Sequence, residues 1–191
     1  MHIFTRDDCV QTEEKINLSG KVVVYSEINP ENSHSNQLFL CMEENSEAGN
    51  IHSAYVKLAS LSNGEYHLGR RENIVGILRP KLLPDEAKLQ LSQIRPGGAM
   101  DLGTHEPQYS GYSFLEDGRY AAGVWLHSTK EVKDYIEMQA PYQHRLLICD
   151  RDDLAVMEVV DGQVVFPAQE DIKACLNGQQ NQQKGGGMEM K

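Results

Sequence analysis

The clearest pattern along the chain is a series of short apolar runs, each separated from the next by a polar turn. Three such runs cover residues 146–149, 154–160 and 163–166, with an aspartate-rich turn after the first and Asp161-Gly162 after the second. An Asp-Gly pair between two β-rich runs is a strong hairpin signal, because both positions of its tight turn need φ > 0. This region is therefore predicted to form a three-stranded antiparallel meander.

The same pattern marks the start of the chain and the region after residue 110. Strands are predicted over residues 18–28, 37–42 and 51–59, and three consecutive valines in the first of them indicate burial on both faces. A second Asp-Gly turn, Glu116-Asp117-Gly118, separates two further predicted strands at 110–115 and 119–126.

Helical periodicity appears in two places. Pro84 and the two acids after it suit the first turn of a helix, and Pro96-Gly97-Gly98 ends it. Ser128 and Glu131 fit a capping box for a second helix over Thr129–Ala140, which the following proline stops. A short third helix is predicted over Gln169–Leu176.

These elements predict an α+β fold of antiparallel β-meanders packed with two main α-helices and a short C-terminal helix. The loop after residue 98 divides the chain into a β-rich N-terminal subdomain, 1–98, that ends in a helix, and an α+β C-terminal subdomain, 99–178, that holds the meander. Residues 179–191 are polar and glycine-rich, and we expect them to be disordered. No apolar run approaches the roughly 20 residues that a membrane helix needs.

Charge and cysteine usage narrow the class of protein. The net charge is −10, which argues against a general duplex-DNA binder and favours attraction to basic surfaces. None of the four cysteines forms a CxxC pair, and Cys41 and Cys149 fall inside apolar strands, where cysteine acts as a small buried hydrophobe. With no secretory h-region at the start, the chain is expected in a reducing bacterial cytoplasm.

No catalytic signature is present. Asp150, Asp152 and Asp153 carry the oxygen ligands that divalent cations prefer, but Leu154 and Ala155 occupy positions where a calcium loop needs a ligand and a glycine. The sequence has no HExxH, no phosphate-binding loop and no nucleophile elbow. We therefore assign no catalytic residue, metal or cofactor, and leave open a metal-dependent nuclease that uses these acids.

The two acidic turns suggest a binding role instead. Held on rigid hairpins, their carboxylates would mimic a phosphate backbone and occupy the basic groove of a nucleic-acid-handling protein through charge-assisted bonds. The alternative is a pair of solvated turns, because aspartate is common in turns for local hydrogen bonding. The candidate partner-binding residues are Glu116, Asp117, Asp150, Arg151, Asp152 and Asp153.

Five stretches carry a resemblance to a known group of proteins. They are MHIFTRDD at 1–8, LSGKVVVY at 18–25, SAYVKLASL at 53–61, SGYSFLEDGRYAAGVW at 110–125 and HRLLICDRDDLAVMEV at 144–159. In these stretches the chain resembles small accessory proteins of conjugative and other mobile elements of Gram-positive gut bacteria. It is loosely similar to members of that group that inhibit type II CRISPR effector nucleases. The resemblance lies in the general sequence pattern and includes no defined motif. It therefore assigns no functional residue in this chain.

The resemblance implies a counter-defence or transfer-support role with a protein partner, with or without the partner's guide RNA. The leading hypothesis is a non-enzymatic mobile-element protein that binds and inhibits a type II RNA-guided nuclease. A metal-dependent nuclease acting on RNA or DNA is the first alternative, and a non-catalytic accessory protein of conjugative transfer is the second. The sequence leaves the oligomeric state open.

Overall fold

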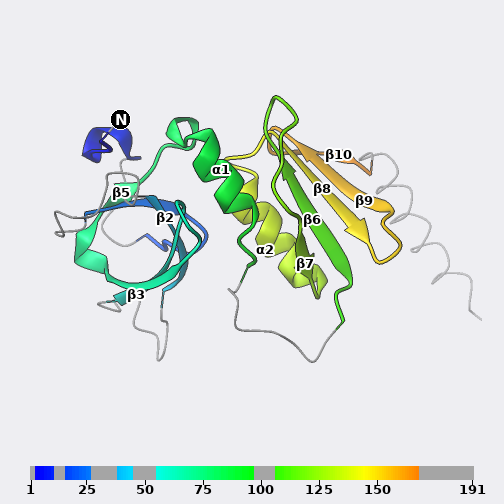
Figure 1. Ribbon diagram of the computed structural model, residues 1–191, viewed down its shortest axis with the longest axis horizontal. Coiled ribbons are helices and arrows are strands. Elements are labelled where there is room, and N and C mark those ends of the chain that lie inside the picture. The colour runs from blue at the N-terminus through cyan, green and yellow to red at the C-terminus, as the bar shows by residue number, and fades with distance from the viewer. Residues whose placement is uncertain (1–2, 11–15, 27–37, 45–54, 97–105, 168–191) are drawn as a thin grey trace, which may run out of the picture.

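The computed structural model describes residues 3–10, 16–26, 38–44, 55–96 and 106–167. Within these ranges the chain forms two five-stranded antiparallel sheets, with helices α1 (Asp85–Ser92) and α2 (Thr129–Gln139) lying between them (Figure 1). The predicted α+β class, with antiparallel sheets and two helices, is confirmed. The predicted helix over Gln169–Leu176 and the tail 179–191 lie outside the described residues.

The first sheet has the strand order β4-β3-β2-β1-β5, and it curls round on itself (Figure 1). A single-turn 3-10 helix, η4 (Arg71–Asn73), connects β4 at one edge of this sheet to β5, which runs in the same sense as β4 and pairs with β1 at the other edge. The sequence pattern assigned no strand to either β4 or β5. The strands are β1 (Val22–Tyr25), β2 (Leu38–Glu44), β3 (Tyr55–Ser60), β4 (Tyr66–Arg70) and β5 (Ile74–Ile77).

Strand β1 is buried on both faces, as its run of valines predicted. Val23 and Tyr25 pack inside the curl of the first sheet, with Phe39 and Leu58. Val22 and Val24 face the other way, into the cluster that holds both α-helices. The first sheet therefore has an apolar surface on each side and needs a second layer outside it.

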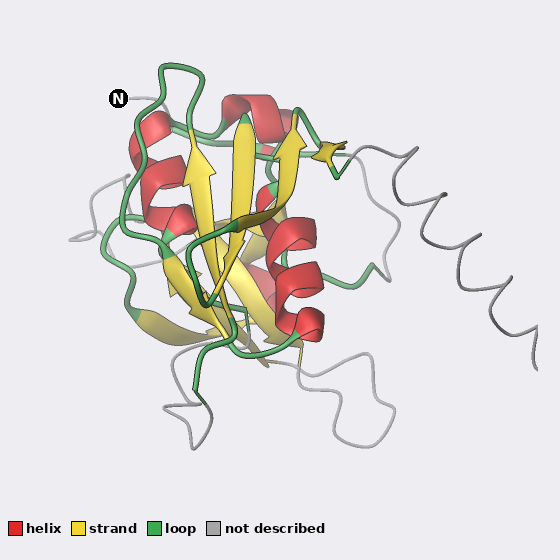
Figure 2. Ribbon diagram, turned by 90° about the vertical axis from the view of Figure 1, so that its right-hand side faces the viewer, coloured by secondary structure: helices red, strands yellow, loops and turns green. Residues whose placement is uncertain are grey.

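The second sheet supplies that layer and has the order β10-β9-β8-β6-β7. It lies on the right of Figure 1 and therefore nearer the viewer in Figure 2. Among the described residues, no helix has the length and apolar character needed to cross a membrane. The strands are β6 (Tyr109–Phe114), β7 (Val124–Leu126), β8 (Arg145–Asp150), β9 (Ala155–Val160) and β10 (Gln163–Phe166).

One predicted strand is wrong in its first half. Residues 119–123 do not pair as a strand, and only β7 remains of the predicted 119–126 segment. Arg119 closes the turn, because its carbonyl accepts the N–H of Leu115 and its guanidinium holds Asp117. Tyr120 then packs over Tyr112 instead of extending the ladder.

The two halves of the chain share one hydrophobic cluster. In this cluster, the side of β1 and β2 that faces the helices packs against α1. Tyr135 and Met138 of α2 connect the cluster to β7 and β8. Side chains near the end of α2 also satisfy backbone groups of the N-terminal half. Gln139 Nε2 donates to the carbonyl of Leu91 at 2.8 Å, and Val22 N–H donates to Tyr142 Oη at 3.0 Å. Hydrophobic packing and buried hydrogen bonds thus fix α2 against both sheets.

Candidate functional site

The structure places the two predicted acidic turns at opposite ends of the second sheet. Tyr109 pairs with Asp150 and Phe114 pairs with Arg145, so β6 spans the distance between them. At about 3.4 Å per residue, the turn after Phe114 lies roughly 17 Å from the turn that begins at Asp150. The six residues therefore do not form one acidic surface.

At the first end, an arginine of the chain balances one of the two candidate carboxylates. Asp117 accepts from the N–H of Arg119 at 3.0 Å and from its Nε at 2.6 Å, and these bonds lower the pKa of Asp117. The same guanidinium also contacts Asp85 at 3.0 Å. Glu116 lines a pocket together with Lys81 and Lys88. Among the described residues Glu116 forms no ion pair, so this turn offers a partner one free carboxylate.

At the second end, the four candidates divide into structural and exposed residues. Asp150 Oδ1 accepts the N–H groups of Asp152 at 2.9 Å and Leu154 at 3.0 Å, so this carboxylate holds the turn together. Arg151 pairs with Glu106. Asp152 and Asp153 are exposed, and among the described residues neither forms an ion pair. At this end of the sheet, these two acids are the candidates available to a partner.

The different roles of Asp150 and Asp152 give a direct prediction. Asp150→Ala leaves two turn N–H groups without their acceptor and is expected to lower the free energy of unfolding by about 1–2 kcal/mol. Asp152→Ala removes an exposed carboxylate and should change it by less than about 0.5 kcal/mol. Urea denaturation of both variants makes the comparison. Equal losses would show that Asp150 does not hold the turn.

The described part of the chain, the two acidic turns included, holds no candidate metal centre. Within those ranges, no group of three or more His, Cys, Asp or Glu side chains is placed to hold a metal ion. Cys9, Cys41 and Cys149 are free and buried, as the apolar setting of the last two predicted. Burial raises the pKa of the Cys149 thiol, and the nearby charges of Asp153 and Asp150 raise it further.

A further surface feature is the face of the second sheet that points away from α2, here called the outer face. Tyr135 of α2 contacts Gly111 and Ser113, which fixes the alternate residues of β6 on the opposite side. Residues that pair across neighbouring strands point to the same side of the sheet, so the outer face can be followed from β6 to the other four strands. Its residues are Trp125, Ser110 and Cys149; Tyr112, Leu147, Glu158 and Phe166; and Phe114, Arg145, Val160 and Gln163.

Some large side chains of the outer face are open to solvent, whereas Ser110 and Cys149 on the same face are buried. Trp125 is 64% exposed and Phe166 45% exposed, and Tyr120, at 56%, packs over Tyr112 and Phe114. Antiparallel sheets that leave one face wet normally place polar residues there. An exposed face rich in aromatic residues instead marks an interaction site.

The outer face is also electrically balanced, and two of its aromatic rings have close packing neighbours. Its charged strand residues, Arg145 and Glu158, pair with each other, and the guanidinium of Arg145 lies 5.1 Å from the centre of the Phe114 ring. Gly123 lets Tyr112 lie against the backbone, because a Cβ there would meet the Tyr112 ring at 2.6 Å. Fixed aromatic rings bind a partner at a low cost in conformational entropy.

The acidic-turn hypothesis did not include this face. The signal that would have located it is the alternation in residues 109–114, where Tyr112 and Phe114 share one side while Gly111 and Ser113 share the other. The pattern alone does not say which side α2 covers. The contact between Tyr135 and Gly111 decides it.

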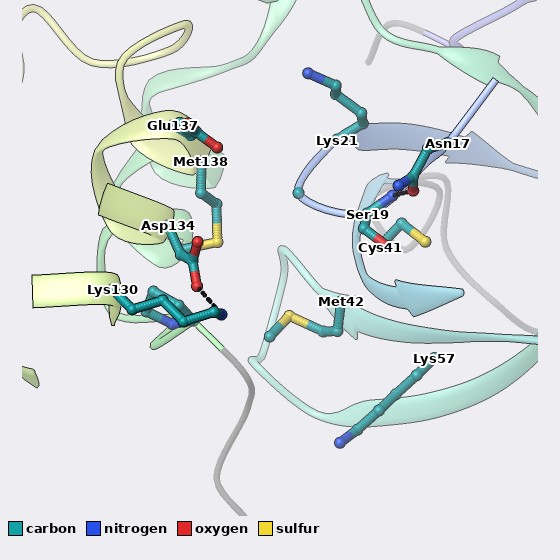
Figure 3. A pocket seen from close by; sticks show the side chains of 12 residues that line it. Asn17, Ser19, Lys21, Cys41, Met42, Lys57, Lys130, Asp134, Glu137 and Met138 are labelled. Carbon is teal, nitrogen blue, oxygen red and sulfur yellow. Dashed lines mark hydrogen bonds and ion pairs between the residues drawn. The ribbon is translucent and has the colours of Figure 1, made fainter. Parts of the chain in front are cut away.

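A cleft of about 630 Å³ between the first sheet and α2 is a second candidate (Figure 3). Lys21, just before β1, Lys57 of β3 and Lys130 of α2 line it. Asp134 and Glu137 line it as well, and Lys130 pairs with Asp134 at 2.8 Å. The charges in the cleft are mixed, so they do not select an anionic ligand.

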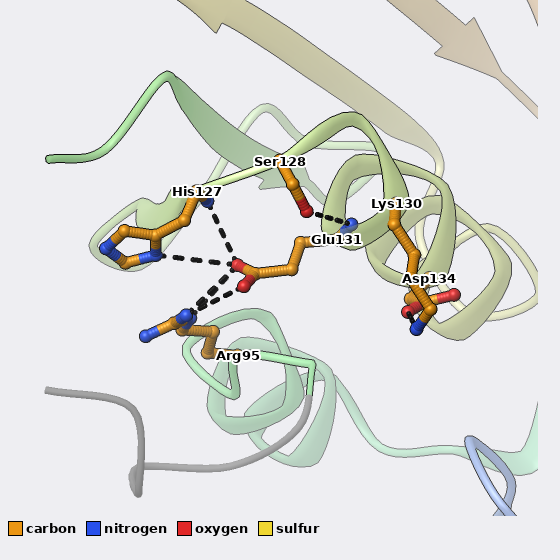
Figure 4. Close-up of polar contacts among 6 residues, drawn as sticks. All are labelled: Arg95, His127, Ser128, Lys130, Glu131 and Asp134. Carbon is orange, nitrogen blue, oxygen red and sulfur yellow. Dashed lines mark hydrogen bonds and ion pairs between the residues drawn. The ribbon is translucent and has the colours of Figure 1, made fainter. Parts of the chain in front are cut away.

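A partly buried charge cluster links the end of α1 to the start of α2 (Figure 4). Arg95 Nη2 lies 2.9 Å and 3.1 Å from the two carboxylate oxygens of Glu131. The predicted capping box is confirmed in one half, since Ser128 Oγ accepts from the Glu131 N–H. In the other half, the Glu131 carboxylate accepts from the N–H of His127. The arginine thus determines where this carboxylate points.

This cluster predicts a pH-dependent contribution to stability. Burial opposes ionisation of Glu131, but the hydrogen bonds from Arg95 and His127 outweigh it and lower its pKa. A lowered pKa stabilises the folded state above the unfolded value of about 4.3, and this stability is lost as the pH falls through the folded value. Glu131→Gln should therefore cost about 1–3 kcal/mol at neutral pH, and less below about pH 4.

Urea denaturation at both pH values tests this prediction, with Asp134→Asn as the matched control. Asp134 pairs with Lys130 on the same helix, but the lysine side chain is 84% exposed. Breaking such a surface pair changes stability by less than about 0.5 kcal/mol. A pH-independent loss in Glu131→Gln would contradict the proposed role of its charge.

Comparisons with known proteins identify no relatives. No protein-family model matches the sequence, and no curated protein or solved structure matches it either.

Proposed function

We propose that this chain is a non-enzymatic binding protein that uses the outer face of the second sheet to dock on a basic surface of another protein. The observation that carries the proposal is the exposure of Trp125, Tyr120 and Phe166 on one face of the second sheet. Exposed Trp and Tyr side chains are the residues that most often dominate binding energy at protein interfaces.

Charge supports a basic partner. The chain carries a net charge of −10, while the outer face itself is balanced by the Arg145–Glu158 pair. Asp152 and Asp153 are exposed at one end of the sheet, next to this face. Acidic groups at the rim of an apolar interface speed association with a basic partner and exclude acidic ones.

We further propose that the partner is a nucleic-acid-handling effector, and that binding inhibits it in the manner of mobile-element counter-defence proteins. Such an effector holds its nucleic acid in a positively charged channel, as a type II RNA-guided nuclease does. The acidic chain would be attracted to this channel, and the aromatic face would supply the short-range contacts. In this proposal, Asp152 and Asp153 contribute to attraction and the outer face contributes most of the affinity.

An inhibition assay tests the proposal. A panel of purified type II RNA-guided nucleases, each loaded with its guide RNA, is given a plasmid target with and without this protein. The proposal predicts loss of cleavage for a susceptible nuclease, with the guide RNA left intact. Cleavage of the guide RNA that stops on adding a chelator would support the metal-dependent nuclease instead. If no nuclease in the panel is bound or inhibited, this choice of partner is wrong.

A further inference from the structure

We infer that the cleft between the first sheet and α2 binds a short zwitterionic peptide, with a free amino group at one end and a free carboxylate at the other. The inference goes beyond the proposed function, because the outer face of the second sheet points away from α2 and is separate from this cleft. It rests on the volume of the cleft, on the charged groups of its two walls and on the apolar side chains between them.

The cleft has the size of a small-ligand site and is formed by both halves of the chain. Its volume of about 630 Å³ falls within the roughly 300–1,000 Å³ typical of such sites. Residues just before β1, together with β2 and β3, form one wall, and α2 forms most of the other (Figure 3). Ligand sites are common where two parts of a chain meet in this way.

The wall on the side of the first sheet offers positive charge. Lys21 and Lys57 both line it. Among the described residues neither lysine forms an ion pair, and the ammonium group of Lys57 lies 5.5 Å from the centre of the Tyr66 ring. A ligand carboxylate can therefore approach these two ammonium groups without displacing a described carboxylate of the chain.

The wall formed by α2 carries two carboxylates, and one of them is open to a ligand. Asp134 is held by Lys130 at 2.8 Å. Glu137 lines the cleft about one turn further along α2, and its contact with Lys133 is a longer 3.6 Å between two mostly exposed side chains. Surface pairs of this kind are weak, so a ligand ammonium group can compete with Lys133 for Glu137.

Apolar side chains lie between the charged groups. Met42 and Met138 line the cleft from opposite walls, and Figure 3 shows them on either side of the gap. The flexible methionine side chain adapts to apolar partners of different shape. A ligand that carries charge of one sign only would leave one wall unmatched, whereas a zwitterion with an apolar middle matches both walls and the methionines between them.

The separation of the walls favours a peptide over a free amino acid. Layers of secondary structure pack roughly 10 Å apart. Three extended residues span about 10 Å, whereas the amino nitrogen and the carboxyl carbon of a single amino acid are only about 2.5 Å apart. A tripeptide therefore reaches Glu137 and Lys21 together, and a single amino acid reaches one wall at a time.

NMR of the full chain with ¹³C-labelled methionine methyl groups tests the inference, with trialanine, both termini free, as the probe. The resonances of Met42 and Met138 are expected to shift in parallel during the titration and to give one weak affinity. Met157, on β9 of the second sheet, is the internal control and should not shift. Met42→Leu and Met138→Leu assign the first two resonances.

Blocked forms of the same peptide separate the two walls. Acetylating the amino end or amidating the carboxyl end should each weaken binding about 3–5-fold, the effect of losing one partly exposed ion pair. In Glu137→Gln, acetylation should no longer weaken binding. In the double variant Lys21→Gln with Lys57→Gln, amidation should no longer weaken it. Lys81→Gln removes an exposed lysine outside the cleft and is the matched control.

The inference is overturned if trialanine shifts neither cleft methionine, if the doubly blocked peptide binds as tightly as the free one, or if Met157 shifts as much as Met42. Free alanine binding as tightly as trialanine would overturn the choice of a peptide. No step involves a nuclease, and Trp125→Ala should leave trialanine binding unchanged. Failure of this inference and failure of the proposed function are therefore distinguishable.

Discussion

Replacing Tyr135 with alanine is expected to lower the free energy of unfolding by about 3–5 kcal/mol, the range for deleting a buried aromatic side chain. Tyr135 is fully buried in the cluster shared by the two halves of the chain. Its ring packs against Gly111 of β6, where an added Cβ would lie 2.7 Å from a ring atom. The alanine variant would therefore leave a cavity between α2 and the second sheet.

The hydroxyl group of Tyr135 makes a smaller, separable contribution. It lies 2.6 Å from Ser113 Oγ, and burial raises its pKa, so it stays neutral. Tyr135→Phe keeps the ring and leaves the buried Ser113 hydroxyl without this partner, which should cost about 1–2 kcal/mol. Lys133→Ala, on the exposed side of the same helix, is the control and should change stability by less than about 0.5 kcal/mol.

Urea denaturation followed by circular dichroism measures these three variants. Because the cluster joins both halves, the Tyr135→Ala chain should still unfold in a single transition at a lower urea concentration. A loss below about 1 kcal/mol would contradict the burial of this ring between α2 and the sheet. A second transition confined to one half would contradict the shared core.

The second large effect concerns binding. Trp125→Ala is expected to weaken inhibition of a susceptible nuclease at least about 30-fold, corresponding to the 2 kcal/mol or more of an interface hot spot. Because Trp125 is 64% exposed in the free chain, the same change should cost less than about 1 kcal/mol of folding stability. The two measurements together separate a binding role from a structural one.

Leu68→Ala is the matched control for Trp125→Ala. Leu68 is 69% exposed, but it lies on β4 of the first sheet, away from the outer face. It should leave inhibition unchanged within about twofold, as expected for a residue outside the interface. Equal effects of the two substitutions would show that inhibition does not depend on the outer face.

Local sequence signals predicted the parts of the fold that depend on local chemistry. The valine run specified a doubly buried strand, and the Asp161-Gly162 pair marked the hairpin between β9 and β10. The capping residue Ser128 and the helical periodicity that follows it predicted α2. The strands β4 and β5 were both missed. Strand β5 is only four residues long, contains Gly76 and pairs with the distant β1.

The candidate site was harder to predict, because it depends on register and on tertiary cover. The acidic turns were located correctly along the chain, but only the pairing of β6 with β8 shows that they lie at opposite ends. The role of Asp150 in its own turn was also invisible, since a structural and an exposed aspartate have the same sequence pattern. Likewise, the apolar alternation in β6 fits either face until α2 covers one of them.

Fluorine NMR of the chain labelled with fluorotryptophan tests the central claim most directly, because Trp125 is the only tryptophan and lies on the outer face. The account predicts that the single resonance shifts or broadens when an inhibited, unlabelled nuclease is added. A resonance that stays unchanged in a complex that still inhibits would show that the partner binds elsewhere.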